Sequence, residues 1–186
     1  MLPLDKQGGV VVCDESYAGW MARAVLDHII WEMGQGFETL FSNLKDLRPE
    51  DWAWVPPGGA RSIAAIVGHV ASSKVMYDNH AFGDASLTWM DPLFGAAQSP
   101  VGGGGPSPEE LVAWLRESEL RLLRNVEALG DDAELLRERP VNWGGTMPTR
   151  WIINRLIHHD GYHAGEINHL RSVRQGDDRW EWERGS

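Results

Sequence analysis

Hydrophobic residues recur along this chain at spacings of three and four positions in four long segments, which are separated by stretches rich in proline and glycine. This spacing places apolar side chains on one face of an α-helix. The pattern predicts helices over about residues 16–44, 62–82, 107–129 and 147–175. No segment shows the alternation typical of a half-buried strand, and no internal repeat is visible. We therefore expect a single all-α domain over residues 1–186.

The ends of three predicted helices carry local signals. Ser62 is suited to an N-cap because its hydroxyl can accept a hydrogen bond from a free backbone N–H. Ser107, Pro108 and Glu110 combine a capping hydroxyl, proline in the first turn and a glutamate three residues on, which is a strong helix start. Gly176 is suited to end the last helix.

The connection over residues 83–106 is the longest and ends in four glycines, Gly102–Gly105. Antiparallel neighbours in a helical bundle need only short loops. A connection of this length can instead carry the chain back along the bundle, so that the second and third helices run parallel. The glycine run also suits a flap over a site, and a surface loop without a role is the alternative.

The composition excludes several classes of partner. Acidic residues number 27 against 17 lysines and arginines, for a net charge of −10, which argues against nucleic-acid and anionic-membrane partners because both need a basic surface. No apolar run approaches the ~20 residues of a membrane-spanning helix, and no signal peptide is recognisable. The lone Cys13 cannot form an internal disulfide. We expect a cytoplasmic protein that acts on a small-molecule substrate.

Two histidines, His159 and His163, lie four residues apart in the fourth predicted helix and therefore on one face of it. They continue an apolar stripe, which predicts that they point inward. A third, His69, lies within the apolar second helix. If these helices pack together, three imidazoles meet and can bind a metal ion with open positions for water or substrate. The alternative is that each is a hydrogen-bonded core residue.

A competing metal site has to be considered on the same helix. Glu166 and His169 have the Glu-x-x-His spacing of di-iron four-helix bundles. That site needs the motif twice together with further inward glutamates, and only one copy is present. The sequence therefore disfavours a di-iron centre.

Two glycines, Gly161 and Gly165, also lie four residues apart in the fourth helix. Each costs about 1 kcal/mol relative to alanine inside a helix. Together they give a smooth face that permits close approach of another helix, from this chain or from a second copy. The alternative is that these glycines have no specific role and are tolerated because the helix is well packed.

The histidine-bearing segments resemble a known family. The run Ser62–Val70 is similar to the segment S-I-x-x-(I/L)-x-x-H-(I/V/L) of the DinB/YfiT-like proteins, and His159–Ile167 is similar to their fourth-helix segment H-x-x-x-H-x-G-(Q/E)-I. The loop Trp54–Gly59 also resembles their first interhelix loop. The resemblance covers most of the chain in order and spacing, as far as about Arg174. The two histidine motifs together are fairly specific, whereas either alone would be weak.

The resemblance implies a four-helix bundle with a long crossover between helices two and three, and one divalent metal ion, usually zinc or nickel, held by His69, His159 and His163. It also implies a homodimer and a thiol S-transferase-like metalloenzyme that uses a thiol of the mycothiol or bacillithiol type. A metal-dependent hydrolase and a non-catalytic metal- or ligand-binding stress protein are the alternatives. Where many relatives have glutamine, this chain has Glu166, a candidate catalytic base, fourth ligand or partner of a ligand.

Overall fold

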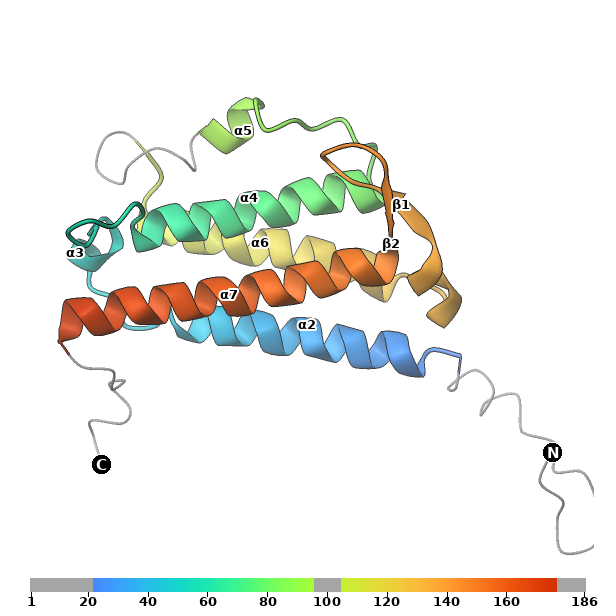
Figure 1. Cartoon of the computed structure of the whole chain (residues 1–186), viewed down its shortest axis with the longest axis horizontal. Helices are drawn as coiled ribbons and strands as arrows, with labels where there is room; N and C mark the ends of the chain where they lie inside the picture. The colour runs from blue at the N-terminus through green and yellow to red at the C-terminus, as the bar shows by residue number, and fades with distance from the viewer. Residues whose placement is uncertain (1–21, 96–104, 177–186) are drawn as a thin grey trace, which may run out of the picture.

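The computed structural model describes residues 22–95 and 105–176, and four long helices make up most of this part of the chain (Figure 1). They are α2 (Ala24–Ser42), α4 (Ile63–Phe82), α6 (Pro108–Glu127) and α7 (Thr149–Gln175). The expectation of an all-α four-helix bundle is confirmed. Residues 16–21, which we expected to begin the first helix, and Cys13 lie outside the described residues. No helix in the described ranges is both long and apolar enough to span a bilayer.

Shorter elements occupy the connections between the long helices. They are α3 (Pro49–Trp52), α5 (Pro92–Gly95), the 3₁₀ helix η2 (Asp132–Leu136) and the strands β1 (Glu138–Pro140) and β2 (Thr146–Pro148). The strands pair antiparallel, with Arg139 opposite Met147. Our expectation of no strand was therefore wrong. Each strand has only three residues, which is too short for an alternating pattern to be visible in the sequence.

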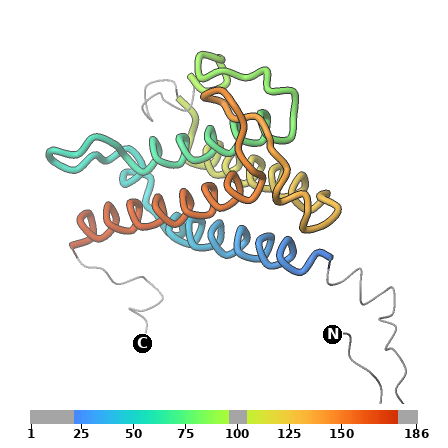
Figure 2. Tube along the Cα trace, turned by 45° about the vertical axis from the view of Figure 1, so that its right-hand side comes forward, coloured from blue at the N-terminus to red at the C-terminus, as the bar shows by residue number. Residues whose placement is uncertain are grey.

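The long connection between α4 and α6 is a crossover, as expected. In Figures 1 and 2 the chain leaves one end of α4, passes back along the bundle through α5, and enters α6 at the opposite end. Consequently α4 and α6 run in one direction, and α2 and α7 run in the other. The flap expected at the glycine run falls mostly on residues 96–104, outside the described part of the chain.

Local capping explains where three of the helices begin or end. The Ser62 hydroxyl accepts a hydrogen bond from the backbone N–H of Ala65, and Ser107 and Glu110 form the predicted reciprocal capping box. Such a cap contributes about 1 kcal/mol. Gly176 ends α7 with φ at 80°, in the left-handed region that glycine adopts without a steric penalty.

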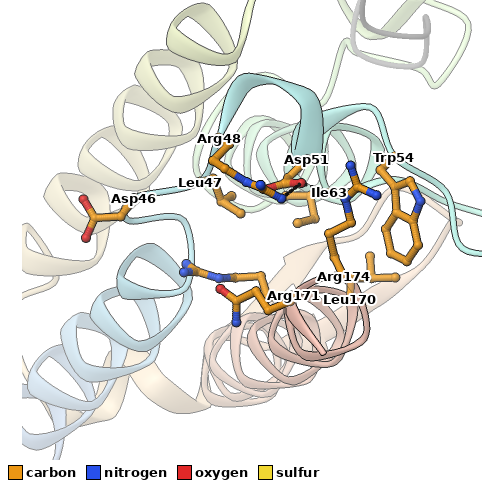
Figure 3. A pocket seen from close by; sticks show the side chains of 10 residues that line it. Asp46, Leu47, Arg48, Asp51, Trp54, Ile63, Leu170, Arg171 and Arg174 are labelled. Atoms are coloured by element: carbon orange, nitrogen blue, oxygen red, sulfur yellow. Dashed lines mark hydrogen bonds and ion pairs between the residues drawn. The ribbon is translucent and has the colours of Figure 1, made fainter. Parts of the chain in front are cut away.

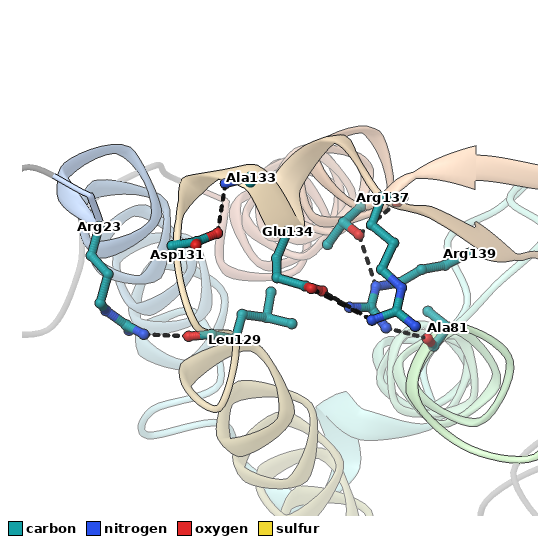
Figure 4. A network of polar contacts seen from close by, with 9 residues as sticks. Arg23, Ala81, Leu129, Asp131, Ala133, Glu134, Arg137 and Arg139 are labelled. Carbon is teal, nitrogen blue, oxygen red and sulfur yellow. Dashed lines mark hydrogen bonds and ion pairs between the residues drawn. The ribbon is translucent and has the colours of Figure 1, made fainter. Parts of the chain in front are cut away.

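A polar network fixes the start of α7 against the rest of the bundle (Figure 4). The Arg139 guanidinium donates to the Glu134 carboxylate at 2.8 Å, to the Thr149 hydroxyl at 2.8 Å and to the Ala81 carbonyl at 3.2 Å. These contacts join η2, β1, the end of α4 and the first residue of α7. The relative placement of α4 and α7 is thereby determined at one end of their contact.

The apolar core of the described residues has two large clusters along the bundle axis and a smaller one, in which Val75 and Met76 of α4 pack with Phe94 of α5. Of the two large clusters, one surrounds Leu115 and Ile167 near α3, and the other surrounds Leu122 and Leu156 near the strands. These last four residues are almost completely buried. The turns of α4, α6 and α7 that lie between the two large clusters carry charged side chains, which are described with the site below.

Candidate metal centre

The contact between α4 and α7 brings the three predicted histidines together. The Nε2 atom of His159 lies 3.2 Å from Nε2 of His69 and 3.2 Å from Nε2 of His163. Potential ligand atoms of all three residues lie within 4.8 Å of one another. His159 and His163 share a face of α7 because they are four residues apart, and His69 reaches the same point from the middle of α4. We call these three residues the histidine cluster.

The histidine cluster lies in a groove at the surface and not inside the core. His163 is only 2 % exposed, His159 is half-buried and His69 is exposed. A groove of about 520 Å³ opens over them. It is lined by Arg61, His69, Arg155, His158, His159, Tyr162 and His163. The predicted inward orientation therefore fits His163 but not the whole cluster, because the two helices leave the edge of their contact open to solvent.

Glu166 lies behind the histidine cluster and contacts His163. Its Oε2 atom is 2.8 Å from Nδ1 of His163, and its two carboxylate oxygens accept hydrogen bonds from Arg61 at 2.9 and 3.1 Å. An ionised carboxylate can only accept, so His163 donates through Nδ1 and its Nε2 lone pair points into the cluster. Glu166 thus has the geometry of a residue that orients a ligand. Arg61, which sequence reasoning missed, holds it there.

The electrostatic surroundings keep the histidine cluster neutral. Burial lowers the pKa of His69 and His163, and burial together with the neighbouring positive charges lowers the pKa of His159 to about 3. Neutral imidazole is the form that binds metal ions. These side chains therefore stay in the ligand form at neutral pH.

The donor set fits a divalent metal ion. A tetrahedral zinc ion with nitrogen ligands at ~2.0–2.1 Å holds those nitrogens about 3.3 Å apart, close to the two 3.2 Å separations in the cluster. Three imidazole nitrogens that face one another cannot all be satisfied by shared protons, because each neutral ring has one N–H. The other ring nitrogen of His159, Nδ1, is buried without a hydrogen-bond partner among the described residues, so no contact on that side fixes the tautomer of His159. A metal ion would accept the converging lone pairs.

A second polar cluster lies on the other side of the same turn of α7, and sequence reasoning missed it. The Lys74 ammonium is 2.5 Å from the Glu119 carboxylate and 2.7 Å from the Asp160 carboxylate, and each side chain is at most 3 % exposed. Burial opposes the charge of Lys74, but the two carboxylates outweigh it and raise its pKa. Burial raises the pKa of Asp160 to about 6. We call these residues the buried triad.

The other histidine-containing patterns do not form sites in the described ranges. His169 is exposed and lies outside the histidine cluster. His28 is on the surface of α2, where it stacks on Trp31 and lies 3.7 Å from Glu32. His80 contacts the backbone carbonyl of Leu87. Within the described residues, the histidine cluster is the one group suited to hold a metal ion.

A larger cavity, about 680 Å³, lies away from the histidine cluster at the end of α7 (Figure 3). Its arginines already have structural partners. Arg48 and Arg174 both donate to the Asp51 carboxylate, at 2.8 and 2.9 Å. Arg171 donates to two backbone carbonyls just after α2. These contacts connect α3 and the end of α2 to α7. The residues around this cavity therefore have a structural role.

Comparison with known proteins gives a family but no assigned activity. No curated protein matches the chain. A crystal structure of a conserved protein from Enterococcus faecalis has a similar fold, with a TM-score of 0.60 and 13 % sequence identity over 82 % of this chain and 98 % of that one. The sequence profile of the DinB superfamily matches residues 32–167, a range that contains all three clustered histidines. The chain belongs to the DinB superfamily.

Proposed function

We propose that the histidine cluster holds one divalent transition metal ion, zinc or nickel, and that the protein is a metal-dependent enzyme of the thiol S-transferase type. The observation that supports this proposal is the convergence of three imidazole nitrogens at the floor of an open groove. The thiol is a low-molecular-weight thiol of the mycothiol or bacillithiol class.

The openness of the groove favours turnover over simple metal storage. A structural or storage site is closed by protein ligands, whereas a catalytic site keeps a position for water or substrate. Here His69 is exposed, and about 520 Å³ of space lies directly above the cluster. A substrate can therefore reach the ion without movement of the helices.

When bound, the ion supplies Lewis acidity at its open positions, which favours the thiolate form of a thiol. The chain's own residues orient the histidine ligands and hold them in place. Glu166 keeps the Nε2 lone pair of His163 directed at the cluster, and Arg61 holds Glu166. In thiol transfer the sulfur forms a bond to an electrophilic carbon while the leaving group departs with its electron pair. Water in the open groove receives the thiol proton, because Glu166 is engaged by two partners.

Metal content decides the first half of the proposal. Protein purified without a histidine tag should contain about one equivalent of transition metal per chain by plasma mass spectrometry. The His159→Ala/His163→Ala double variant should contain none. The matched control is His28→Ala/His169→Ala, which removes two exposed histidines outside the cluster and should keep its metal. If the wild-type chain takes up neither zinc nor nickel, the metalloenzyme proposal is wrong.

Activity assays decide the second half. The metal-loaded protein should transfer a low-molecular-weight thiol to an electrophile such as a chloronitrobenzene, and the double variant should not. Hydrolysis of ester or amide substrates without any thiol dependence would replace transfer by metal-dependent hydrolysis. Full metal occupancy without either activity would leave the binding-protein alternative.

We further propose that the chain forms a homodimer. A Cβ atom added at Gly161 or Gly165 would meet nothing within 4 Å, so within residues 22–95 and 105–176 no other helix packs on that smooth face. Trp31 and Tyr162 are 57 % and 67 % exposed on the neighbouring surface of α2 and α7. Light scattering should give twice the chain mass, and Gly161→Leu/Gly165→Leu should give the mass of one chain.

A further inference from the structure

The groove over the histidine cluster has a positively charged wall. Arg155 lines it one helical turn before His159, and Arg61 lines it from the loop before α4. No carboxylate is among the lining residues. The chain as a whole has a net charge of −10, so this groove has a charge opposite to that of the rest of the molecule.

The two arginines differ in whether a carboxylate of the protein neutralises their charge. Arg61 is paired with Glu166, at 2.9 Å. Arg155 has no carboxylate partner within salt-bridge distance in the described ranges, and its charge acts directly on His159. A planar guanidinium matches the two oxygens of a carboxylate with parallel hydrogen bonds. Arg155 is therefore the available anion-binding group beside the metal centre.

Aromatic side chains lie near Arg155, outside the residues that line the groove itself. The Tyr77 side chain interacts with Arg155. The Tyr77 ring packs edge-on against Trp143 at 5.9 Å, and Trp143 packs against Trp151 at 5.8 Å. Trp143 is 52 % exposed and Trp151 is 39 % exposed. An exposed pair of indoles offers a flat apolar surface to a ligand.

We propose that the substrate of this groove carries a carboxylate, which Arg155 binds, and an aromatic or other apolar body, which packs on Trp143 and Trp151. The inference rests on the proposed function for the ion but uses different residues. It assigns a carboxylate to Arg155, because one guanidinium matches two oxygens and one negative charge, whereas a dianion would also need the proposed ion to balance it. Bound in this way, the carboxylate end of the substrate lies nearest the histidine cluster.

Three small probes test the proposal by isothermal calorimetry on the full chain, loaded with zinc. Benzoate has the carboxylate and the ring, benzamide is its uncharged counterpart, and phenyl phosphate carries the alternative anion. Benzoate should bind at least tenfold more tightly than benzamide. Tighter binding of phenyl phosphate than of benzoate would overturn the carboxylate assignment.

Substitutions locate the binding group. Arg155→Gln should weaken benzoate at least tenfold and leave benzamide unchanged, whereas Arg155→Lys should lose less. Arg124→Gln is the matched control, since Arg124 is an exposed arginine on α6 that lines neither this groove nor the surface around Trp151. It should bind benzoate within twofold of wild type. Equal loss in both glutamine variants, or no loss in Arg155→Gln, would overturn the proposal.

The experiment separates failure of this inference from failure of the metal proposal. Metal content is measured on every sample, and each titration is repeated after zinc is removed with a chelator. A contrary result is benzoate binding that occurs only when zinc is present and has the same affinity in Arg155→Gln as in wild type. That result would show that benzoate coordinates the ion alone, and it would overturn the Arg155 assignment. If the chain binds no metal, the same Arg155→Gln comparison on the metal-free protein still tests the carboxylate site.

Discussion

Two neighbouring residues of α7 belong to polar clusters of opposite kinds. His159 points into the histidine cluster, which is open to solvent, and Asp160 points into the buried triad, which is sealed between the two large apolar clusters of the core. The triad joins an ammonium to two carboxylates. The histidine cluster joins three neutral rings whose nitrogens face one another.

The difference teaches which cluster is complete without a ligand. The buried triad contains its own cation, and Lys74 pairs with both carboxylates, although the group keeps a net charge of −1 when both are ionised and Oδ1 of Asp160 has no hydrogen-bond partner among the described residues. In the histidine cluster at most one of the two nitrogen–nitrogen contacts can be a hydrogen bond, because the same Nε2 atom of His159 serves both, and this is the arrangement that an ion completes. Loss of a triad residue should therefore affect folding, and loss of a cluster residue should affect metal binding.

The largest expected effect is on folding. Lys74→Met leaves two carboxylates buried without their cation, and breaking a buried pair in this way costs about 3–5 kcal/mol. Urea unfolding of the metal-free protein should show this loss of free energy of unfolding. Lys45→Met, at an exposed lysine, should stay within about 0.5 kcal/mol of wild type.

A rescue variant sharpens this test if Lys74→Met fails to fold. Neutralising the whole triad with Lys74→Met/Glu119→Gln/Asp160→Asn removes the uncompensated charges and should recover much of the lost stability. A loss below about 1 kcal/mol in Lys74→Met would contradict a structural role for the triad.

The next effect is on metal affinity. Structural zinc sites bind with about 10–16 kcal/mol shared among four ligands, so one ligand contributes roughly 3 kcal/mol. His163→Ala should therefore weaken zinc binding by about a hundredfold or more, as measured by competition with a chromophoric chelator. His169→Ala should leave the affinity unchanged. Comparable affinities for the two variants would remove His163 from the ligand set.

A smaller effect on metal affinity is expected from Glu166, which contacts a ligand but lies behind it. Glu166→Ala removes the acceptor for the Nδ1–H of His163, and loss of such a partner costs ~10–100-fold in metal affinity. Glu166→Gln keeps an acceptor oxygen and should lose less. A total loss of metal in Glu166→Gln would instead indicate that the carboxylate is itself a ligand.

The smallest net effect is expected on the pH dependence of stability, because the two neighbours act with opposite signs and partly offset one another. His159 has its pKa lowered from 6.5 to about 3, so the unfolded chain binds its proton first and stability is lost as the pH falls through this window. Asp160 has its pKa raised from 3.8 to about 6, so the folded chain binds its proton first and stability is lost as the pH rises.

Urea unfolding at pH 4, 5, 6 and 7 in the presence of a chelator separates the two contributions. His159→Gln should make the increase of stability with pH shallower, and Asp160→Asn should make it steeper. Equal slopes in both variants would show that neither group titrates differently in the folded and unfolded states.

Helix periodicity and the two histidine motifs predicted the bundle, the crossover and the meeting of His69 with the pair on α7. These features depend on spacing within one helix and on a family pattern, both visible in the sequence. The i,i+3 contact between His163 and Glu166 is local in the same sense. Spacing could not show that the cluster opens to solvent, because exposure depends on how α4 and α7 cross.

The missed features all depend on contacts between distant segments. Lys74 is a single charge in an apolar helix, which is a visible signal, but its partner Glu119 lies on α6 and can be found only from the packing of the helices. Arg61 reaches Glu166 across more than a hundred residues. Arg155 gains significance only from the groove that it lines.

The two helices that carry the clustered histidines are far apart in the chain, because His69 and His159 are separated by 90 positions. An ion shared between them would act as a reversible cross-link that closes a loop of this length. Cross-links over long loops restrict the unfolded chain and cost it several kcal/mol of conformational freedom. Metal supply would then set the lifetime of the folded protein as well as the chemistry in its groove.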